Sequence, residues 1–286
     1  MIGKATVHGA VSIVNGAICG KGVSLGVDLR TTATVEITED GRWNLTSNNT
    51  QRESMLLINT VKNVLGIHKN KFGATINVTT EIPEGVGLKS SSSSSVAVAL
   101  ATMAALGHDS YDEKSILNIS ADASLESGVS ITGAIDDATA CLLGNACFCD
   151  NMKRIVMQIK EVGSYHVLIK VPICKRKKID VQYMRLFSRE AETIFDIAYR
   201  KDIWVAMTMN GLLCSIIFGY DTNPSMQAIE CGAVAAGLSG LGPSVAAIFD
   251  DNNENLRRLK SIWAKDGSRV IECRTSSKKG EMMTVE

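Results

Sequence analysis

A glycine-rich turn followed by six consecutive serines constrains the fold of this chain more than any other feature of its sequence. Before the turn, residues 75–82 alternate apolar and polar side chains, as a half-buried β-strand does, and Pro83 ends that alternation. Gly85 and Gly87 let the backbone turn tightly and come close to another group. After the serines an apolar run extends through Leu106, which predicts a helix. The stretch therefore predicts a strand, a tight loop and a helix in direct succession.

The start of this helix has the features of an anion site. Ser90 or Ser91 is the expected N-cap, and the backbone N–H groups and the positive end of the helix dipole suit a phosphate. The neighbouring serine hydroxyls offer hydrogen bonds or Mg²⁺ ligands, and Lys89 adds a positive charge. An ordinary glycine–serine turn is the alternative interpretation, but one N-cap needs only one serine. The pattern therefore favours nucleotide binding.

This loop is not a Walker-type P-loop, because the pattern GxxxxGK[ST] occurs nowhere in the chain. The segment nearest to that pattern runs from Gly16 to Gly22. Its spacing is wrong, and no hydroxyl residue follows Lys21. A phosphate at the glycine–serine loop would therefore be bound in a different manner.

Composition argues against several other classes of function. The 286 residues carry a formal net charge of zero, which argues against nucleic acid or an anionic membrane as the main partner. Eight cysteines are too sparse for a disulfide scaffold, and Cys147 and Cys149 lack the second pair that a zinc site needs. The chain shows neither a signal peptide nor an apolar span of membrane length. We therefore expect a soluble cytoplasmic protein.

Hydrophobic periodicity divides the chain into two halves, the second of which starts near Tyr165. In the first half we expect strands up to residue 39 and a hairpin turn at Asp40-Gly41 into a strand over 42–47. Helices are expected over 51–65 and 112–127. A turn into a helix or strand follows over 129–140, and then strands over 141–149 and 155–159. In the second half we expect strands over 166–171, 245–249 and 269–273, and helices over 181–199, 203–217, 226–236 and 255–265. The tail from Ser276 is polar and is expected to be frayed.

Three separate segments, which together span nearly the whole chain, share one resemblance. The first consists of Gly3-Lys4, His8-Gly9 and Gly16, followed by Leu29-Arg30-Thr31. The second is the loop over 83–92, which resembles a phosphate loop of the form P-x-G-x-G-L-G-S-S, and the third is the glycine-rich segment 237–244. All three resemble motifs of the GHMP kinases, the superfamily of galactokinase, homoserine kinase, mevalonate kinase and phosphomevalonate kinase.

Two strings narrow this resemblance. They are Gly-Leu-Lys-Ser-Ser-Ser over 87–92 and the segment 122–137, and both are similar to the archaeal-type shikimate kinases, a branch unrelated to the P-loop shikimate kinases of bacteria. Two departures from mevalonate kinase agree with this branch. Ala10-Val11 stands where mevalonate kinases carry Glu-His, and Lys89 replaces a glycine of the usual phosphate loop.

The resemblance implies a two-domain α+β fold of the GHMP kinase type. Residues 1–160 would form an ATP-binding domain like ribosomal protein S5 domain 2, and residues 161–286 a ferredoxin-like domain. ATP and substrate would lie in the cleft between them. The implied reaction converts ATP and shikimate into ADP and shikimate 3-phosphate, within chorismate and aromatic amino acid biosynthesis. Mg²⁺ would accompany the ATP, and a homodimer is a candidate assembly.

The resemblance also assigns site residues. The ATP phosphates would contact the loop and two glycines of the closing motif, namely Pro83, Glu84, Gly85, Val86, Gly87, Leu88, Lys89, Ser90, Ser91, Ser92, Ser93, Gly240 and Gly242. Asp136 aligns with an aspartate beside the substrate hydroxyl and would accept or orient its proton. Lys4 matches a lysine near the transferring phosphate, where a point charge stabilises the transition state. The alternatives are a helix N-cap for Asp136 and an exposed terminal lysine for Lys4.

For the metal, Ser91 is the expected hydroxyl ligand, although the serine run leaves its register open. Glu126 lies at about the superfamily's spacing for a Mg²⁺ ligand, and Asp122, one helical turn earlier, is the alternative. Either carboxylate could instead be a solvated charge on a helix.

A carboxylate substrate such as shikimate favours a nearby arginine, because the guanidinium group matches a carboxylate with two hydrogen bonds. Arg30 is the first candidate, with Lys175 and Arg176 behind it, and the spacing does not select among them. Two alternative functions stay open at this point: another kinase of the superfamily, acting on homoserine or mevalonate, and a non-catalytic metabolite-binding regulator.

Overall fold

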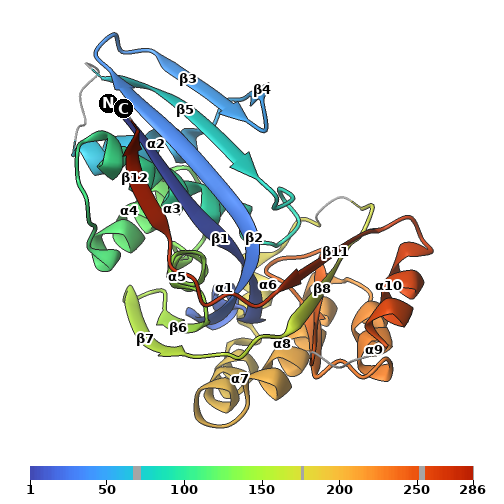
Figure 1. Ribbon diagram of the computed structural model, residues 1–286. Helices are drawn as coiled ribbons and strands as arrows, with labels where there is room; N and C mark the ends of the chain where they lie inside the picture. Colours follow the sequence, from blue (N-terminus) through green and yellow to red (C-terminus); the bar gives the residue numbers. More distant parts are fainter. Residues whose placement is uncertain (67–71, 175–176, 251–254, 286) are drawn as a thin grey trace.

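Figure 1 shows the computed structural model, which describes residues 1–66, 72–174, 177–250 and 255–285 as two β-sheets with helices packed against them. The strands of the first sheet are β1 (Ile2–Val14), β2 (Lys21–Thr38), β3 (Trp43–Ser47), β4 (Thr50–Gln51), β5 (Gly73–Thr80), β6 (Ala146–Asp150), β7 (Ile155–Lys160) and β12 (Glu281–Val285). Their order is β12-β1-β2-β5-β3-β4, with β6 paired to β2 and β7 to β6. The mixed arrangement confirms the predicted α+β class.

The hairpin of β1 and β2 is the backbone of this sheet. The short helix α1 (Gly16–Cys19) joins the two strands, and two register shifts bend them. The second half of β2, from Thr31 to Thr38, pairs with β5, while its first residues, from Lys21 to Leu25, pair with β6. One long strand therefore connects the two ends of the sheet, and its first residues lie between the end of β1 and β6.

Four helices complete this half of the protein: α2 (Met55–Leu65), α3 (Ser90–Ala105), α4 (Glu113–Glu126) and α5 (Ile135–Leu143). α3 lies at their centre and packs against β1 and β2, and its residues from Ser92 to Ala105 are almost all buried. Alanine and valine dominate this stretch because a helix that is surrounded on all sides needs small apolar residues all round. The core formed in this way holds the first turn of α3 in a fixed position.

The second sheet is antiparallel in the order β11-β8-β10-β9, and its strands are β8 (His166–Val171), β9 (Ala235–Leu238), β10 (Val245–Phe249) and β11 (Arg269–Arg274). The helices are α6 (Val181–Arg185), α7 (Ser188–Arg200), α8 (Ile203–Phe218), α9 (Asn223–Glu230) and α10 (Leu256–Ala264). α8 crosses β9 at a close approach of two backbones: a Cβ atom built on Gly211 would lie 2.1 Å from the Cα atom of Gly237. No helix within the described ranges is long and apolar enough to span a membrane.

Most elements lie where the sequence predicted them. The side chain of Ser54 caps α2, which ends at Gly66, and the side chain of Asp112 caps α4. Strands β8, β10 and β11 and helices α8 and α10 match their predicted ranges to within a residue or two. The segment 129–140, left open between helix and strand, becomes a loop followed by α5.

Three local predictions are wrong because long-range pairing decides them. The strand after Asp40-Gly41 pairs in parallel with β5 rather than folding back on β2, because β5 already occupies that edge of β2. The helix predicted over 226–236 ends at Glu230, and Ala235 and Ala236 instead join β9, paired with β10. The helix predicted over 181–199 is divided into α6 and α7 by a turn.

The predicted frayed tail is also wrong, because residues 281–285 form β12 on the free edge of β1. Figure 1 shows the two chain ends side by side at this edge. Two side-chain contacts hold the segment: the Tyr111 hydroxyl donates to the Gly280 carbonyl at 2.9 Å, and the Thr284 hydroxyl donates to the Ala104 carbonyl at 2.9 Å. The polar composition of the tail is that of an exposed edge strand. The boundary near residue 160 stays a prediction, and β12 crosses back over it.

We expect that deleting residues 281–286 lowers the melting temperature by several degrees, because it removes the pairing partner of β1 and exposes part of the core under α3. A protein of this size shifts by about 2–4 °C for each kcal/mol lost. Met283→Thr, which keeps a strand-forming residue at an exposed position, is the matched control. An unchanged melting temperature for the deletion would contradict a structural role for β12.

Candidate active site

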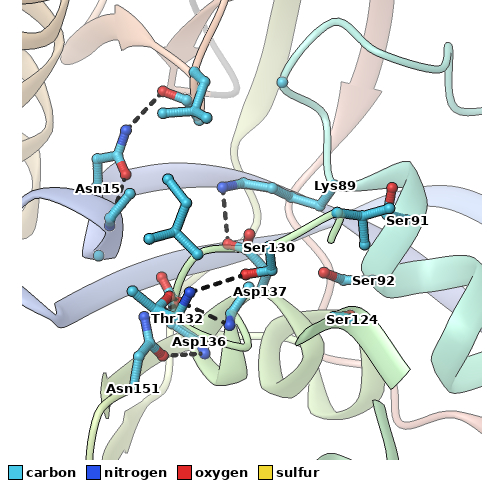
Figure 2. A pocket seen from close by; sticks show the side chains of 18 of the residues that line it. Asn15, Lys89, Ser91, Ser92, Ser124, Ser130, Thr132, Asp136, Asp137 and Asn151 are labelled. Carbon is cyan, nitrogen blue, oxygen red and sulfur yellow. Dashed lines mark hydrogen bonds and ion pairs between the residues drawn. The ribbon is translucent and has the colours of Figure 1, made fainter. Parts of the chain in front are cut away.

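A cleft of about 440 Å³ lies where the two helices α3 and α5 begin and where the ends of β1 and β9 meet them. Figure 2 shows its lining from close by. The residues come from four parts of the chain: 15–17, 85–92, 124–151 and 240–241. No single segment forms this site, so its geometry depends on the whole fold.

The glycine–serine loop rests on the closing glycine-rich segment. The Ser239 hydroxyl donates to the Gly87 carbonyl at 2.8 Å, and the backbone N–H of Ser244 donates to the Val86 carbonyl at 3.1 Å. Gly87 has a φ of 86°, and a Cβ atom there would lie 2.2 Å from the Ser239 carbonyl oxygen. A glycine is therefore required, both for the conformation and for the close approach.

The end of β1 fastens the closing segment from the other side. Ser12 donates its backbone N–H to the Ser239 hydroxyl at 3.1 Å and accepts from the backbone N–H of Gly240 at 3.0 Å. The Asn15 side chain donates to the Gly240 carbonyl at 2.8 Å. Segments that are more than 220 residues apart are thus connected by buried hydrogen bonds, which orders the rim of the cleft.

Two helices begin at the cleft without a side-chain cap. The N-cap residue of α3 is Lys89, with a φ of 64°, and that of α5 is Ala134, with a φ of 51°. The predicted caps Ser90 and Ser91 are therefore wrong: they form the first turn of α3 instead. The left-handed turn at Lys89 starts the helix one residue earlier, and no side chain covers the first N–H groups of α3.

A buried ion pair joins the starts of the two helices. The Nζ atom of Lys89 lies 2.8 Å from Oδ1 of Asp137, and the two side chains are only 8% and 15% exposed. The Ser24 hydroxyl donates to the same Asp137 oxygen at 2.6 Å. Asp136, the neighbouring residue, is also buried, so two adjacent carboxylates and one lysine share a site that is largely shielded from water.

Burial raises the pKa of Asp136 to about 7, and the negative charge of Asp137 adds to the rise, while Lys89 and a hydrogen bond from Asn151 oppose it. Burial by itself would lower the pKa of Lys89, but the charges of Asp137 and Asp136 outweigh it and raise that pKa. Lys89 therefore stays charged, and Asp136 titrates close to neutral pH. A carboxyl group with such a pKa suits a general base.

Many of the residues predicted for phosphate binding do line the cleft: Gly85, Gly87, Leu88, Lys89, Ser90, Ser91, Ser92 and Gly240, together with the predicted catalytic Asp136. Others support it from outside. The Ser93 hydroxyl donates to the Ser90 carbonyl at 3.1 Å, and Gly242 packs against the ring of Tyr220. Pro83 and Val86 belong to the same loop without lining the cleft, and Glu84 forms an ion pair with Arg52 at a neighbouring cavity.

Lys4 and Arg30 do not reach the cleft. Lys4 is exposed on β1, where it pairs with Thr34 and Met283, at the opposite end of the strand from Asn15. Arg30 is exposed on β2, and its backbone contacts Glu81. Where Lys4 and Arg30 lie along β1 and β2 keeps both side chains away from the cleft, and the sequence motif does not indicate this position. Lys175 and Arg176, the other candidates to bind a carboxylate, lie outside the described residues.

The two predicted carboxylate ligands of a metal also lie elsewhere. Glu126 is exposed and accepts a hydrogen bond from the Asn63 side chain at 3.3 Å, and Asp122 pairs with Arg154 at 2.6 Å. Among the described residues no three His, Cys, Asp or Glu side chains gather to hold a metal. The hydroxyls of Ser91, Ser92 and Ser124 remain at the cleft. Mg²⁺ that is carried by phosphates usually takes only one or two ligands from the protein.

A second cavity of about 530 Å³ continues from the first around Gly85, Ser90, Ser91 and Val129. Its floor contains Leu45, Leu57 and Val78 from β3, α2 and β5, and Arg52 and Glu84 stand at its side. The uncapped first turn of α3 thus lies between this cavity, which has an apolar floor and polar sides, and the cleft that holds Asp136.

Sequence reasoning missed several side chains of the site: Ser124, Ser130 and Thr132, which line the cleft, as well as Asn15, Ser24 and Asn151. Asn151 donates to Oδ1 of Asp136 at 2.8 Å and accepts from the backbone N–H of Asp136 at 3.0 Å. The one signal in the sequence was a polar residue directly after an apolar strand, as Asn15 follows β1 and Asn151 follows β6. Such a residue is common at strand ends, so the signal is weak.

Comparisons with known proteins agree with this geometry. The family model described as "GHMP kinases N terminal domain" matches residues 56–145. A shikimate kinase of Methanothrix thermoacetophila is 34% identical over 99% of this chain and 96% of its own length, and one of Methanocella arvoryzae is 35% identical over 95% and 93%. The crystal structure of the mevalonate kinase of Methanococcus jannaschii superposes with a TM-score of 0.69 at 17% identity, covering 96% of this chain and 98% of that one.

The raised pKa of Asp136 predicts how stability depends on pH. Between the pKa of an unfolded aspartate and about 7, the folded state holds a proton that the unfolded state has lost, so stability falls as the pH rises through this range. Asp136→Asn removes this penalty. We expect the free energy of unfolding of this variant, relative to that of the wild type, to be higher at pH 8 than at pH 5 by on the order of 1 kcal/mol or more.

Asp266→Asn is the control, because the pKa of Asp266 is shifted in the opposite direction to that of Asp136. Lys170 and Ser268 lower the pKa of Asp266 to about 2, so its charge stabilises the fold above the pKa of the unfolded state. This variant should lose stability at both pH 5 and pH 8. Thermal melts at the two pH values measure both effects. An equal shift for Asp136→Asn at both pH values would contradict the elevated pKa.

Proposed function

Because the chain belongs to the GHMP kinase superfamily and to the family of the archaeal shikimate kinases, we propose that it transfers the terminal phosphoryl group of ATP to a hydroxyl of shikimate, giving ADP and shikimate 3-phosphate. The protein is an ATP-dependent small-molecule kinase. Within the structure, the proposal is carried by the buried carboxyl group of Asp136 at the start of α5. It lies close to Lys89, which stands at the uncapped start of α3.

The triphosphate would lie at the first turn of α3. No side chain caps that turn, so the N–H groups of Ser90 to Ser92 can donate to phosphate oxygens, aided by the helix dipole. Gly87 allows the loop to approach closely, and Gly240 lines the facing wall. The nucleoside would occupy the neighbouring cavity, whose apolar floor suits the face of a base.

Mg²⁺ would enter with the phosphates, and the hydroxyls of Ser91, Ser92 and Ser124 are the groups of this chain placed to contact it. When bound, the ion supplies positive charge that neutralises the phosphate oxygens. Glu126 and Asp122 take no part in this proposal, because both contact other groups away from the cleft.

The acceptor hydroxyl would lie against Asp136. Phosphoryl transfer depends on positioning and charge more than on covalent chemistry, so the carboxylate needs only to orient the hydroxyl and take its proton. With a pKa of about 7, Asp136 is a stronger base than an ordinary aspartate while still largely ionised at slightly alkaline pH. Ser130 and Thr132, which line the cleft beside it, are candidates to contact the other hydroxyls of the acceptor.

Lys89 would stabilise the charge that develops on the transferred group. Its Nζ atom is held by Asp137 between the phosphate loop and Asp136. The sequence pattern assigned such a role to Lys4, which lies on the exposed part of β1. In this proposal the phosphate loop itself supplies the lysine, at the position where the usual motif has a glycine.

The eight cysteines are all free, which supports a reducing compartment such as the cytoplasm. A homodimer stays a prediction.

A coupled assay of ADP release tests the substrate. We expect turnover with shikimate and little with homoserine or mevalonate, since the full-length relatives carry the first activity in their names. Turnover with mevalonate alone would refute the proposed acceptor. ATP binding without turnover on any of the three alcohols would favour the metabolite-binding regulator.

Substitutions of Asp136, Lys89 and Lys4 test the roles proposed for these residues in phosphoryl transfer. Asp136→Asn should bind ATP but lose at least roughly a hundredfold in kcat, the usual scale for a general base, and wild-type kcat/KM should fall below about pH 7. Lys89→Met should lose roughly a hundredfold to a thousandfold, as for other groups that stabilise transition-state charge. Lys4→Met separates the two lysines: a loss as large as that of Lys89→Met would restore the assignment that the motif suggested.

A further inference from the structure

Asn151 holds Asp136 at two points at once. Its Nδ2 atom donates to Oδ1 of the carboxylate at 2.8 Å, and its Oδ1 atom accepts from the backbone N–H of the same aspartate at 3.0 Å. Because one partner is a donor and the other an acceptor, only one orientation of the amide fits both. Asn151 is itself only 2% exposed, and its backbone N–H donates to the Gly20 carbonyl at 2.8 Å.

This contact replaces a missing helix cap. Asp136 lies in the first turn of α5, where backbone N–H groups lack partners within the helix, and the N-cap Ala134 has no side chain that could reach them. Asn151 reaches in from the turn after β6, 15 residues along the chain. The same amide that caps the helix also fixes the rotation of the carboxylate, so position and direction are set together.

Two glycines leave room for this arrangement. A Cβ atom on Gly22 would lie 2.1 Å from Oδ2 of Asp136, and one on Gly16 would lie 2.3 Å from Nδ2 of Asn151. These are the glycines at the ends of the segment that superficially resembled a P-loop. Their place beside the carboxylate and the amide accounts for them without any phosphate.

We propose that Asn151 is the positioning residue of the phosphoryl transfer, which aims the Asp136 carboxylate at the acceptor hydroxyl, with Gly16 and Gly22 shaping its seat. The inference rests on the proposed function of Asp136 as the base. Asn151 holds Oδ1 of the carboxylate at 2.8 Å, whereas Oδ2 accepts only a longer hydrogen bond, of 3.4 Å, from the Ser24 hydroxyl. Oδ2 is therefore the oxygen that can turn to the acceptor hydroxyl.

Besides the amide of Asn151, several charged or titratable groups face Asp136. Asp137 and Cys141 come from α5, Lys89 from the phosphate loop, and Cys147 and Cys149 from β6. Burial raises the pKa of all three thiols, so they stay neutral near pH 7. Asp137 is held by Lys89 and Ser24. The hydrogen bond from Asn151 lowers the pKa of Asp136, and its loss should therefore move the acidic limb of the rate profile to higher pH.

Two variants separate the two contacts of Asn151. Asn151→Ala removes both, whereas Asn151→Asp keeps an oxygen for the Asp136 N–H but loses the donor to the carboxylate and adds a negative charge. Thr139→Val is the matched control: it removes a buried polar group of the same helix, one whose hydroxyl donates to the Ile135 carbonyl. For each variant, kcat, the KM of both substrates, the pH profile of kcat/KM and the melting curve are measured.

We expect both Asn151 variants to lose about a hundredfold in kcat, the cost of a misplaced reacting group, with KM values within a few-fold of the wild type. The acidic limb should shift upward in both, and more in Asn151→Asp. Thr139→Val should keep the wild-type limb. A double-mutant cycle adds the sharpest readout: in the background of Asp136→Asn, Asn151→Ala should cost little further activity, because the residue it positions is already disabled.

Three outcomes would overturn the inference. Asn151→Asp could keep the wild-type kcat, which would make the residue a helix cap only. The activity loss could come without any shift of the limb, or it could persist in full in the Asp136→Asn background. Should Asn151→Ala fail to fold, the isosteric Asn151→Asp decides by the same measures.

The acceptor is kept separate from this test. If the wild type phosphorylates an alcohol other than shikimate, the same variants are assayed with that alcohol. The proposed substrate would then have failed while the role of Asn151 is still decided. If Asp136→Asn itself retains full activity, the proposed base has failed, and the inference fails with it.

Discussion

The ion pair between Lys89 and Asp137 is the contact on which the site depends. Two neighbouring carboxylates at the start of one helix repel each other, and burial makes their charges costly. A lysine from the phosphate loop, 2.8 Å from one of them, offsets much of that cost. The pair therefore joins the starts of α3 and α5 and holds the first turn of α3, where we propose that phosphates bind, close to Asp136. Neither half of the site could keep its geometry without the other.

The starts of α3 and α5 differ from those of several other helices, and α7 and α9, which also lack a side-chain cap, do not begin at a left-handed residue. Asp112, Asp180 and Asp202 cap their helices with side-chain oxygens, whereas α3 and α5 begin at Lys89 and Ala134 in the left-handed region with no side-chain cap. Positive φ at non-glycine residues costs on the order of 1–3 kcal/mol, and such strain concentrates at functional sites. The gain is a pair of helix starts with N–H groups available, one for a ligand and one for Asn151.

How much the sequence could predict depended on the range of the interactions involved. The loop over 85–92 was predictable because glycines, serines and the following helix are neighbours along the chain. Lys4, Arg30 and Glu126 were misplaced because a motif gives spacing but not the position along a bent strand or the face of a helix. Asn151 and β12 owe their places to partners at a distance in sequence, namely Asp136 and β1. No local pattern reports such partners.

This division also explains how one scaffold can serve different acceptors. The side proposed to bind the phosphates is built mainly from backbone groups, at Gly87, Gly240 and the first turn of α3, and backbone geometry tolerates wide change in side chains. The match to a mevalonate kinase structure at 17% identity is what such tolerance predicts. The side proposed for the acceptor consists of side chains from the loop before α5, such as Ser130 and Thr132, which line the cleft with Asp136. In this proposal, a change at Ser130 or Thr132 would alter the acceptor side while leaving the backbone groups of the phosphate side in place.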